Sequence, residues 1–196
     1  MSALEVRRGA IVATLIAIAA GLVAVVHGGL PILSIGVASV IAAWAYSGGP
    51  RPISGTPLGE IFVVAYFGVA AVVGIEWLAV ATASPVTILL GIAIGLPAAG
   101  VLTVNNHRDR VEDARNGRRT LAILVGARGA VALYALELVA AVVLAALASP
   151  SLVGAAIVAV ALVPAGRELN SRLAATAGFQ LVLAGLIALA WLGGFA

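Results

Sequence analysis

The chain is dominated by apolar stretches long enough to cross a lipid bilayer. A bilayer core about 30 Å thick needs roughly 20 apolar residues in a helix, and helices satisfy their own backbone groups inside lipid. Of the residues in the chain, 63% are hydrophobic and only 10% are charged. Soluble domains are usually about 45–50% apolar, so this composition excludes a chain whose main solvent is water. We therefore expect a single all-α domain over residues 1–196, built as a polytopic bundle of transmembrane helices.

Seven segments are predicted to span the membrane, separated by turns that contain Gly, Pro or Ser. The first is too long for the apolar region of a signal peptide and is interpreted as a retained helix. The sixth is short. Without it, however, the arginines that follow it would lie on the opposite side of the membrane from all the other arginines. The predicted spans are Gly9–Val26, Leu30–Ser47, Ile61–Val80, Val86–Val104, Ala130–Ala148, Leu152–Ala165 and Ala174–Leu192.

The positions of the basic residues support this topology. All basic residues are arginines, and they precede the first span or follow the second, fourth and sixth: Arg7, Arg8, Arg51, Arg108, Arg110, Arg115, Arg118, Arg119, Arg128, Arg167 and Arg172. By the positive-inside rule, the N-terminus and the Arg-rich loops are predicted to be cytoplasmic and the C-terminus to lie on the opposite side of the cell membrane. The net charge of +3 then reports topology, and we expect the lipid bilayer, and no nucleic acid, as a partner.

The polar residues are concentrated in the segment 105–119, NNHRDRVEDARNGRR. If the fourth helix continues through this segment, Asn105, Asp109 and Asp113 recur at four-residue intervals along one stripe, where neighbours about 6 Å apart can share a cation. Carboxylates beside arginines suit a magnesium diphosphate, because Mg²⁺ binds carboxylates and phosphates while guanidinium groups bind phosphate oxygens bidentately. The alternative is a solvated loop whose arginines only fix topology. The regular spacing favours the site.

These motifs resemble the UbiA superfamily of membrane prenyltransferases, and within it the 1,4-dihydroxy-2-naphthoate polyprenyltransferases. NNHRD at 105–109, Asp113 and GRRTLA at 117–122 are similar to the second aspartate-rich motif of the family and its following segment. YSGGPRP at 46–52, with Gly59 and Glu60, resembles a loop of the naphthoate branch, and RELN at 167–170 resembles its last cytoplasmic connection.

The resemblance implies a Mg²⁺-dependent enzyme that transfers a polyprenyl group from polyprenyl diphosphate to an aromatic acid. For the naphthoate branch the reaction includes decarboxylation and gives demethylmenaquinone. Asp109 and Asp113, with Asn105, would hold Mg²⁺ on the diphosphate. The resemblance also implies that Arg118 and Arg119 bind the phosphate groups of the diphosphate. Asn106 and Arg108 would line the cavity that holds it.

Tyr46 and Arg51 are candidates for contact with the aromatic acid or the diphosphate. Alternatively, Tyr46 only anchors its helix at the membrane interface, and the charge of Arg51 only fixes the topology. The first aspartate-rich motif of the nine-helix family has no match in this chain, whose start resembles the approach to the third helix of the family. The resemblance therefore implies the C-terminal seven spans, with the missing N-terminal helices as a possible partner.

Other readings rest on isolated polar residues. A small transporter or channel is the rival function, but transporter sites tend to lie near the bilayer midplane. A UbiA-type enzyme for another aromatic acceptor and a non-catalytic subunit also remain. Glu137 either faces a cavity or bonds a neighbouring helix, Glu76 is interpreted as hydrated near an interface, and Gln180 is interpreted as a contact between helices.

Overall fold

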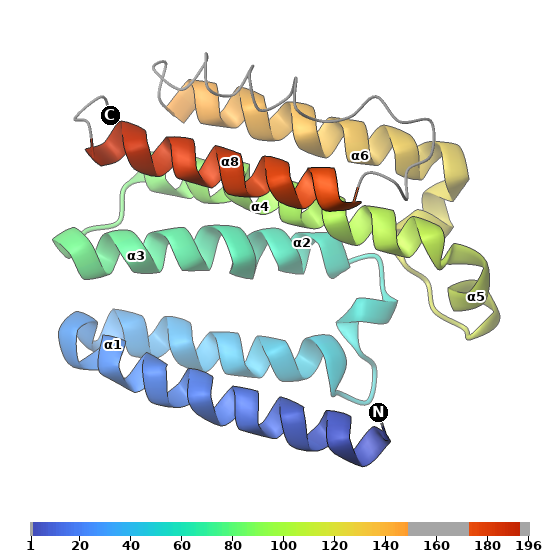
Figure 1. Ribbon diagram of the computed structural model, residues 1–196, viewed down its shortest axis with the longest axis horizontal. Helices are drawn as coiled ribbons and strands as arrows, with labels where there is room; N and C mark the ends of the chain where they lie inside the picture. The colour runs from blue at the N-terminus through green and yellow to red at the C-terminus, as the bar shows by residue number, and fades with distance from the viewer. Residues whose placement is uncertain (1, 149–172, 193–196) are drawn as a thin grey trace.

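The computed structural model describes residues 2–148 and 173–192, and these residues form helices and connecting turns with no strand. The elements are α1 (Ala3–Ser47), the 3-10 turn η1 (Ile53–Gly55), α2 (Gly59–Val63), the π-helical η2 (Val64–Ala70), α3 (Ala71–Val80), α4 (Pro85–Arg108), α5 (Arg110–Arg115), α6 (Leu121–Ala148) and α8 (Leu173–Leu192). The expected all-α bundle is confirmed (Figure 1).

Within the described residues, four helical stretches are long and apolar enough to cross a membrane. They are Leu4–Ser47, Gly59–Val80, Pro85–Arg108 and Leu121–Ala148, as expected for a multi-pass membrane protein. The predicted last span is confirmed as a helix by α8, whereas the sixth, Leu152–Ala165, lies outside the described residues. The number of seven spans therefore stays a prediction.

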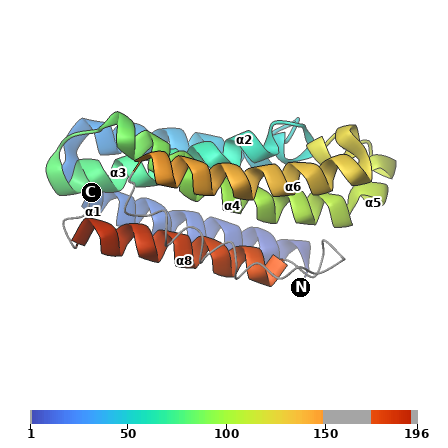
Figure 2. The same cartoon turned by 90° about the horizontal axis from the view of Figure 1, so that it is seen from above.

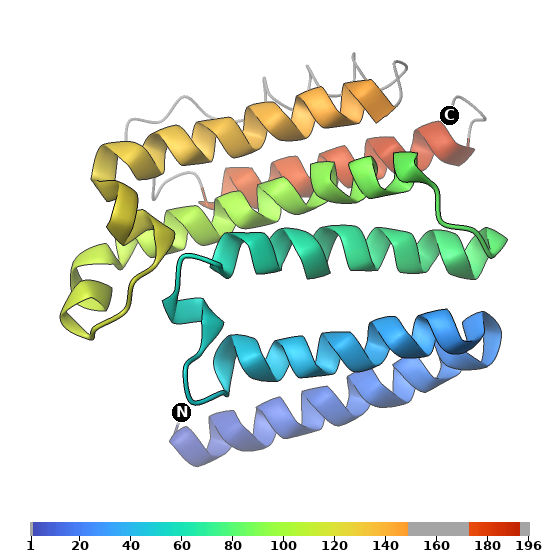
Figure 3. The same ribbon diagram turned by 180° about the vertical axis from the view of Figure 1, so that it is seen from behind.

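The first of these stretches is two helices folded back on each other, and not one long rod. Gly29 has φ 64° and ψ −149°, a conformation that glycine adopts without steric cost, and the chain reverses there (Figure 3). The Nε1 of Trp77 donates a hydrogen bond of 2.9 Å to the carbonyl of Gly28, which fixes this bend against α3. The predicted loop at residues 27–29 is thus a single tight bend that separates the two predicted spans.

Helix α4 lies at the centre of the bundle, in contact with α6, η2 and α8. Its closest approach is to η2, where glycines meet backbone to backbone. A Cβ on Gly68 would lie against the carbonyl oxygen of Gly91 and 2.8 Å from the Cα of Gly95. The small residues at Gly91 and Gly95 therefore permit close helix packing.

Glu76 corrects one sequence interpretation. It is 9% exposed rather than hydrated, and its Oε2 accepts a hydrogen bond of 3.0 Å from the backbone N–H of Ser84. Ser84 is the N-cap of α4, so the carboxylate lies where the positive end of that helix dipole stabilises it. Glu76 thus joins the end of α3 to the start of α4.

The connections alternate between the two ends of the bundle. The first turns of α1, the turn η1 and helix α5 lie at one end, and the bend of α1 and the α3–α4 connection lie at the other (Figures 1 and 2). We call the first of these the arginine end, because Arg7, Arg8 and Arg51 belong to it together with the arginines around α5. This arrangement agrees with the predicted alternation of loops; the side of the membrane that each end faces stays a prediction.

Candidate active site

The polar segment at the arginine end is divided into two helices. Asp109, with φ −90° and ψ 2°, ends α4 and precedes α5, so the predicted stripe is not carried by one continuous helix. The backbone bonds across the break are nevertheless helical in spacing: the N–H of Asp109 donates to Asn105 and that of Asp113 donates to Asp109, at 3.0 and 2.9 Å. Asn105, Asp109 and Asp113 therefore lie on successive turns, while α5 leaves the line of α4.

The chain contains two aspartates, and the structure gives them different surroundings. Asp113 is buried, at 6% exposure, and its Oδ1 accepts a bond of 2.9 Å from Nη1 of Arg118. The carboxylate of Asp109 is 46% exposed and accepts two bonds from Arg108, at 2.7 and 2.9 Å. These bonds from the guanidinium group hold the pKa of Asp109 below its usual range. Both aspartates are thus paired with arginine, but only Asp113 faces the interior.

Arg118 joins two segments that are far apart in the sequence. Its Nη2 donates a bond of 2.7 Å to the carbonyl of Ser54 in η1, while its Nη1 binds Asp113. Gly117, with φ 76°, turns the chain after α5, and the N–H of Arg119 then donates to the carbonyl of Gly55 at 2.8 Å. The loop after α1 and the turn after α5 are therefore fastened together at this point.

Asn106 is buried and makes a contact that the sequence does not predict. Its Nδ2 donates a bond of 3.0 Å to Oε1 of Glu60, at the start of α2. Glu60 is 5% exposed, although sequence reasoning gave it no role beyond the resemblance of its loop. A carboxylate at the first turn of an apolar helix was the signal that could have indicated a buried polar contact.

The remaining predicted site residues are less closely tied. Arg51 and the side chain of Arg119 are exposed and make no hydrogen bond or ion pair within residues 2–148 and 173–192. Tyr46 is half-buried. Its hydroxyl lies 3.9 Å from the point that a Cβ would occupy if Gly59 carried a side chain. No cluster of three or more His, Cys, Asp or Glu side chains that could hold a metal is found in the described part of the chain.

A second polar contact lies further inside the bundle. Oε1 of Glu137 on α6 accepts a bond of 3.0 Å from Thr103 on α4, which supports the contact between helices that was one of its two interpretations. Gln180 on α8 donates to the carbonyl of Ile94 at 3.5 Å, so its interpretation as a contact between helices is confirmed.

Apolar helices packed around α4, with carboxylates and arginines gathered at one end, define a membrane protein whose polar site faces one surface. The chain belongs to the UbiA prenyltransferase family, whose model matches residues 3–172. The resemblance noted from the sequence is therefore confirmed.

Several relatives are named 1,4-dihydroxy-2-naphthoate octaprenyltransferase. The protein of Escherichia coli is 42% identical over 94 residues, covering 48% of this chain and 30% of the relative. That of Bacillus subtilis is 38% identical over 101 residues, covering 52% and 32%. That of Mycobacterium leprae is 30% identical over 140 residues, covering 71% and 48%. The chain therefore spans less than half the length of these relatives. No solved structure matches the chain.

Proposed function

We propose that the chain contributes the diphosphate-binding half of an enzyme that transfers a polyprenyl group to 1,4-dihydroxy-2-naphthoate, with decarboxylation to demethylmenaquinone. The family and the names of the relatives support prenyl transfer to an aromatic acceptor. The observation that carries the proposal is the pairing of buried Asp113 with Arg118 beside Asp109 and Arg108. The proposal is supported by the carboxylates and guanidinium groups that lie together at one end of the apolar helices, where a diphosphate with an apolar tail would bind.

The side chains at this place suit Mg²⁺ in their chemistry. Mg²⁺ prefers oxygen ligands, commonly one or two carboxylates completed by waters and substrate phosphates. Asp109 and Asp113 would hold it on the diphosphate, with Asn105 one turn earlier as a third oxygen ligand. When bound, the ion would neutralise negative charge on the leaving diphosphate.

The arginines would bind and orient the same diphosphate. Arg118 and Arg119 would hold its phosphate oxygens, and their positive charge stabilises the negative charge that develops as the bond to the prenyl carbon breaks. Arg108 lowers the pKa of Asp109, and Asn106, which is buried, would line the inner side of the site. We place Tyr46 and Arg51 at the entrance used by the aromatic acid.

The chain spans only part of the length of its relatives. We propose helices like the N-terminal ones of the family fold as its partner, and we expect weak Mg²⁺ binding by this chain alone. We propose a cytoplasmic arginine end, which would place the diphosphate on the cytoplasmic side of the cell membrane.

The test uses Asp109→Ala, with Glu112→Ala as a matched control. Glu112 is an exposed carboxylate on α5, the short helix that Asp109 precedes. In lipid bilayers, and together with a partner that supplies the N-terminal helices of the family fold, Asp109→Ala should abolish Mg²⁺-dependent prenyl transfer and Mg²⁺-dependent binding of a polyprenyl diphosphate. Glu112→Ala should retain both. Wild-type transfer by Asp109→Ala would refute the assignment.

A further inference from the structure

Two buried glutamates accept hydrogen bonds from the last turns of α4, each from a different neighbouring helix. Oε1 of Glu137 on α6 accepts a bond of 3.0 Å from Thr103, and Oε1 of Glu60 on α2 accepts a bond of 3.0 Å from Asn106. All four side chains are buried. Thr103 and Asn106 are three residues apart, so the two bonds hold adjacent turns of one helix. The end of α4 is therefore tied to α2 and to α6 at the same time.

Both carboxylates are costly to bury, and apolar packing does not offset this cost. Oε2 of Glu60 and Oε2 of Glu137 are buried and accept no hydrogen bond from the residues that the structure describes. A buried acceptor without a donor loses its hydration without compensation, and carboxylates within membrane-spanning segments are rare for this reason. Each glutamate nevertheless uses its other oxygen to bind α4. The contact with α4 is thus the contribution that these two side chains make to the structure.

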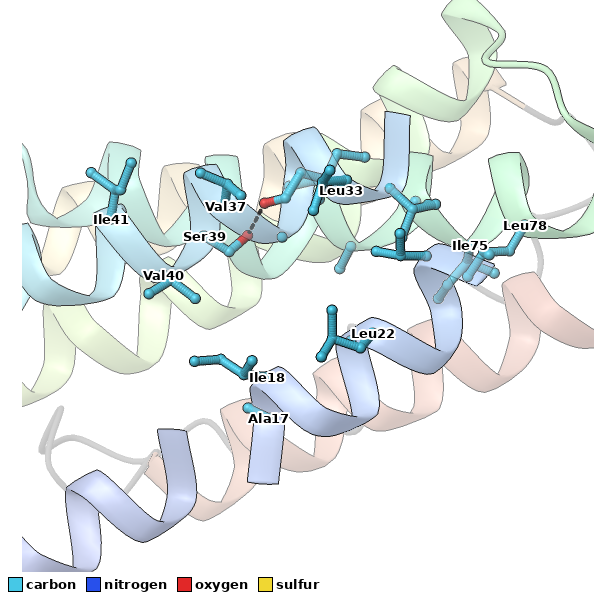
Figure 4. A pocket seen from close by; sticks show the side chains of 18 residues that line it. Ala17, Ile18, Leu22, Leu33, Val37, Ser39, Val40, Ile41, Ile75 and Leu78 are labelled. Carbon is cyan, nitrogen blue, oxygen red and sulfur yellow. Dashed lines mark hydrogen bonds between the residues drawn. The ribbon is translucent and has the colours of Figure 1, made fainter. Parts of the chain in front are cut away.

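The stretch formed by α2, η2 and α3 is loosely packed on the side away from α4. A cavity of about 620 Å³ lies between the α2–η2 segment and the second arm of α1, the arm that follows Gly29. An adjoining cavity of about 650 Å³ lies between the two arms of α1 and α3, and its walls are aliphatic and small residues (Figure 4). Ser39, the polar side chain in these walls, already donates to the carbonyl of Ile35 at 2.8 Å. Because apolar contacts leave space on this side, the bond to Glu60 on the other side fixes α2 against α4.

The turns of α4 that the glutamates hold lead directly into the candidate diphosphate site. Asn105, the first of the proposed Mg²⁺ ligands, lies between Thr103 and Asn106 in the chain, and Asp109 ends the same helix. The backbone N–H of Asp109 donates to the carbonyl of Asn105 at 3.0 Å. Any rotation or fraying of this last turn would therefore move both oxygen ligands.

We propose that Glu60 and Glu137 are positioning residues, which fix the last turns of α4 so that the proposed Mg²⁺ ligands on it keep their orientation. The two glutamates act through their bonds to α4 and do not touch the ligand. This inference rests on the proposed function for the ligand, and it extends the residues on which the site depends to α6. The site requires a hydrogen-bond acceptor from each glutamate, and not its negative charge.

Hydrogen exchange of the chain in lipid nanodiscs measures the order of the end of α4 without any ligand. In Glu60→Leu and in Glu137→Leu, the backbone amides of residues 105–113 should exchange faster by about fivefold or more, which corresponds to the loss of one buried hydrogen bond. Glu60→Gln and Glu137→Gln should keep the wild-type rate, because the amide oxygen of glutamine can accept the same bond.

Glu76→Leu is the matched control, because it removes a third buried glutamate, which accepts from Ser84 at the opposite end of α4. Exchange should become faster at residues 81–88 in this variant and stay at the wild-type rate at residues 105–113. The inference is overturned if either of the other Leu variants leaves exchange at residues 105–113 unchanged. It is also overturned if the Gln variants loosen this segment as the Leu variants do, or if Glu76→Leu loosens it equally.

A binding measurement distinguishes this failure from failure of the proposed function. The probe is farnesyl diphosphate with Mg²⁺, and the chain is measured in bilayers together with a partner that supplies the N-terminal helices of the family fold. Glu60→Leu and Glu137→Leu should weaken Mg²⁺-dependent binding by about fivefold or more, whereas Glu76→Leu should not. If the wild type binds the probe and all three variants bind it equally well, only the inference fails. If the wild type does not bind it while residues 105–113 still loosen in the two variants, the proposed function fails and the ordering of α4 by the glutamates stands.

Discussion

Arg118 and Arg119 are adjacent residues with the same side chain, yet they should contribute differently to the stability of the fold. The guanidinium group of Arg118 bonds Asp113 and the carbonyl of Ser54, whereas that of Arg119 makes no bond within the described ranges. The backbone N–H of Arg119, which donates to Gly55, survives replacement of its side chain. Replacing Arg118 by alanine should therefore lower stability, whereas replacing Arg119 should not. A loss of phosphate binding would be common to both variants.

The expected magnitude follows from the burial of the pair. The side chains of Arg118 and Asp113 are 39% and 9% exposed, so the arginine is partly screened by solvent while the aspartate is not. Exposed ion pairs contribute about 0.2–1 kcal/mol, and leaving a fully buried charge unpaired costs about 3–5 kcal/mol. We expect Arg118→Ala to lower the free energy of unfolding by about 2 kcal/mol, between these limits. Arg119→Ala should change it by less than about 0.5 kcal/mol.

Thermal unfolding of the two variants in the same detergent measures the difference. A loss of about 2 kcal/mol corresponds to a decrease in Tm of about 4–8 °C for a chain of this size. Adding Asp113→Asn to Arg118→Ala should restore part of the loss, because no buried charge is then left without a partner. Equal Tm values for Arg118→Ala and Arg119→Ala would refute the structural role of the ion pair.

Three further predictions concern packing, ionisation and the α1 bend. Gly95→Ala should lower the Tm markedly, since its Cβ would lie 2.9 Å from the backbone of η2, while Gly36→Ala, with nothing within 4 Å, should preserve or raise it. Arg108→Ala should raise the pKa of Asp109 towards its ordinary value, because the bonds from the guanidinium group are lost. In a carboxyl-selective NMR titration, Asp109 of the variant should therefore become protonated at a higher pH than in the wild type. An unchanged midpoint would contradict this. Trp77→Phe should lower the free energy of unfolding by about 1 kcal/mol, because it removes the hydrogen bond to the α1 bend, and an unchanged chemical-denaturation midpoint would exclude that contribution.

The helices could largely be predicted from the sequence because hydropathy and turn residues act locally. The span predicted at Ile61–Val80 differs from the observed Gly59–Val80 by two residues, and that at Val86–Val104 lies inside the observed Pro85–Arg108. The helix predicted to begin at Ala130 instead begins at Leu121, with Gly126 in a non-helical conformation inside it. A local pattern cannot indicate whether a glycine interrupts a helix or bends it, because neighbouring elements decide between the two.

The π-helical conformation of η2 could not be predicted for the same reason. It lies against α4, where Gly68, Gly91 and Gly95 allow the two backbones to meet. The sequence shows the small residues on α4 but not which helix they face. The close contact therefore depends on tertiary structure that hydropathy does not contain.

The sequence could predict which residues belong to the candidate site, but not which residues they form hydrogen bonds with. The sequence identifies the polar segment, yet the bonds of Asn106 to Glu60 and of Arg118 to Ser54 join residues 46 and 64 positions apart. The broken helix at Asp109 also separates two carboxylates that a continuous helix would present alike, leaving Asp109 at the surface and Asp113 inside. The proposed diphosphate would reach the site from water while its tail stays in lipid, and one exposed and one buried carboxylate suit such a ligand. The deviation from a regular stripe is thus consistent with a site at the boundary between lipid and water.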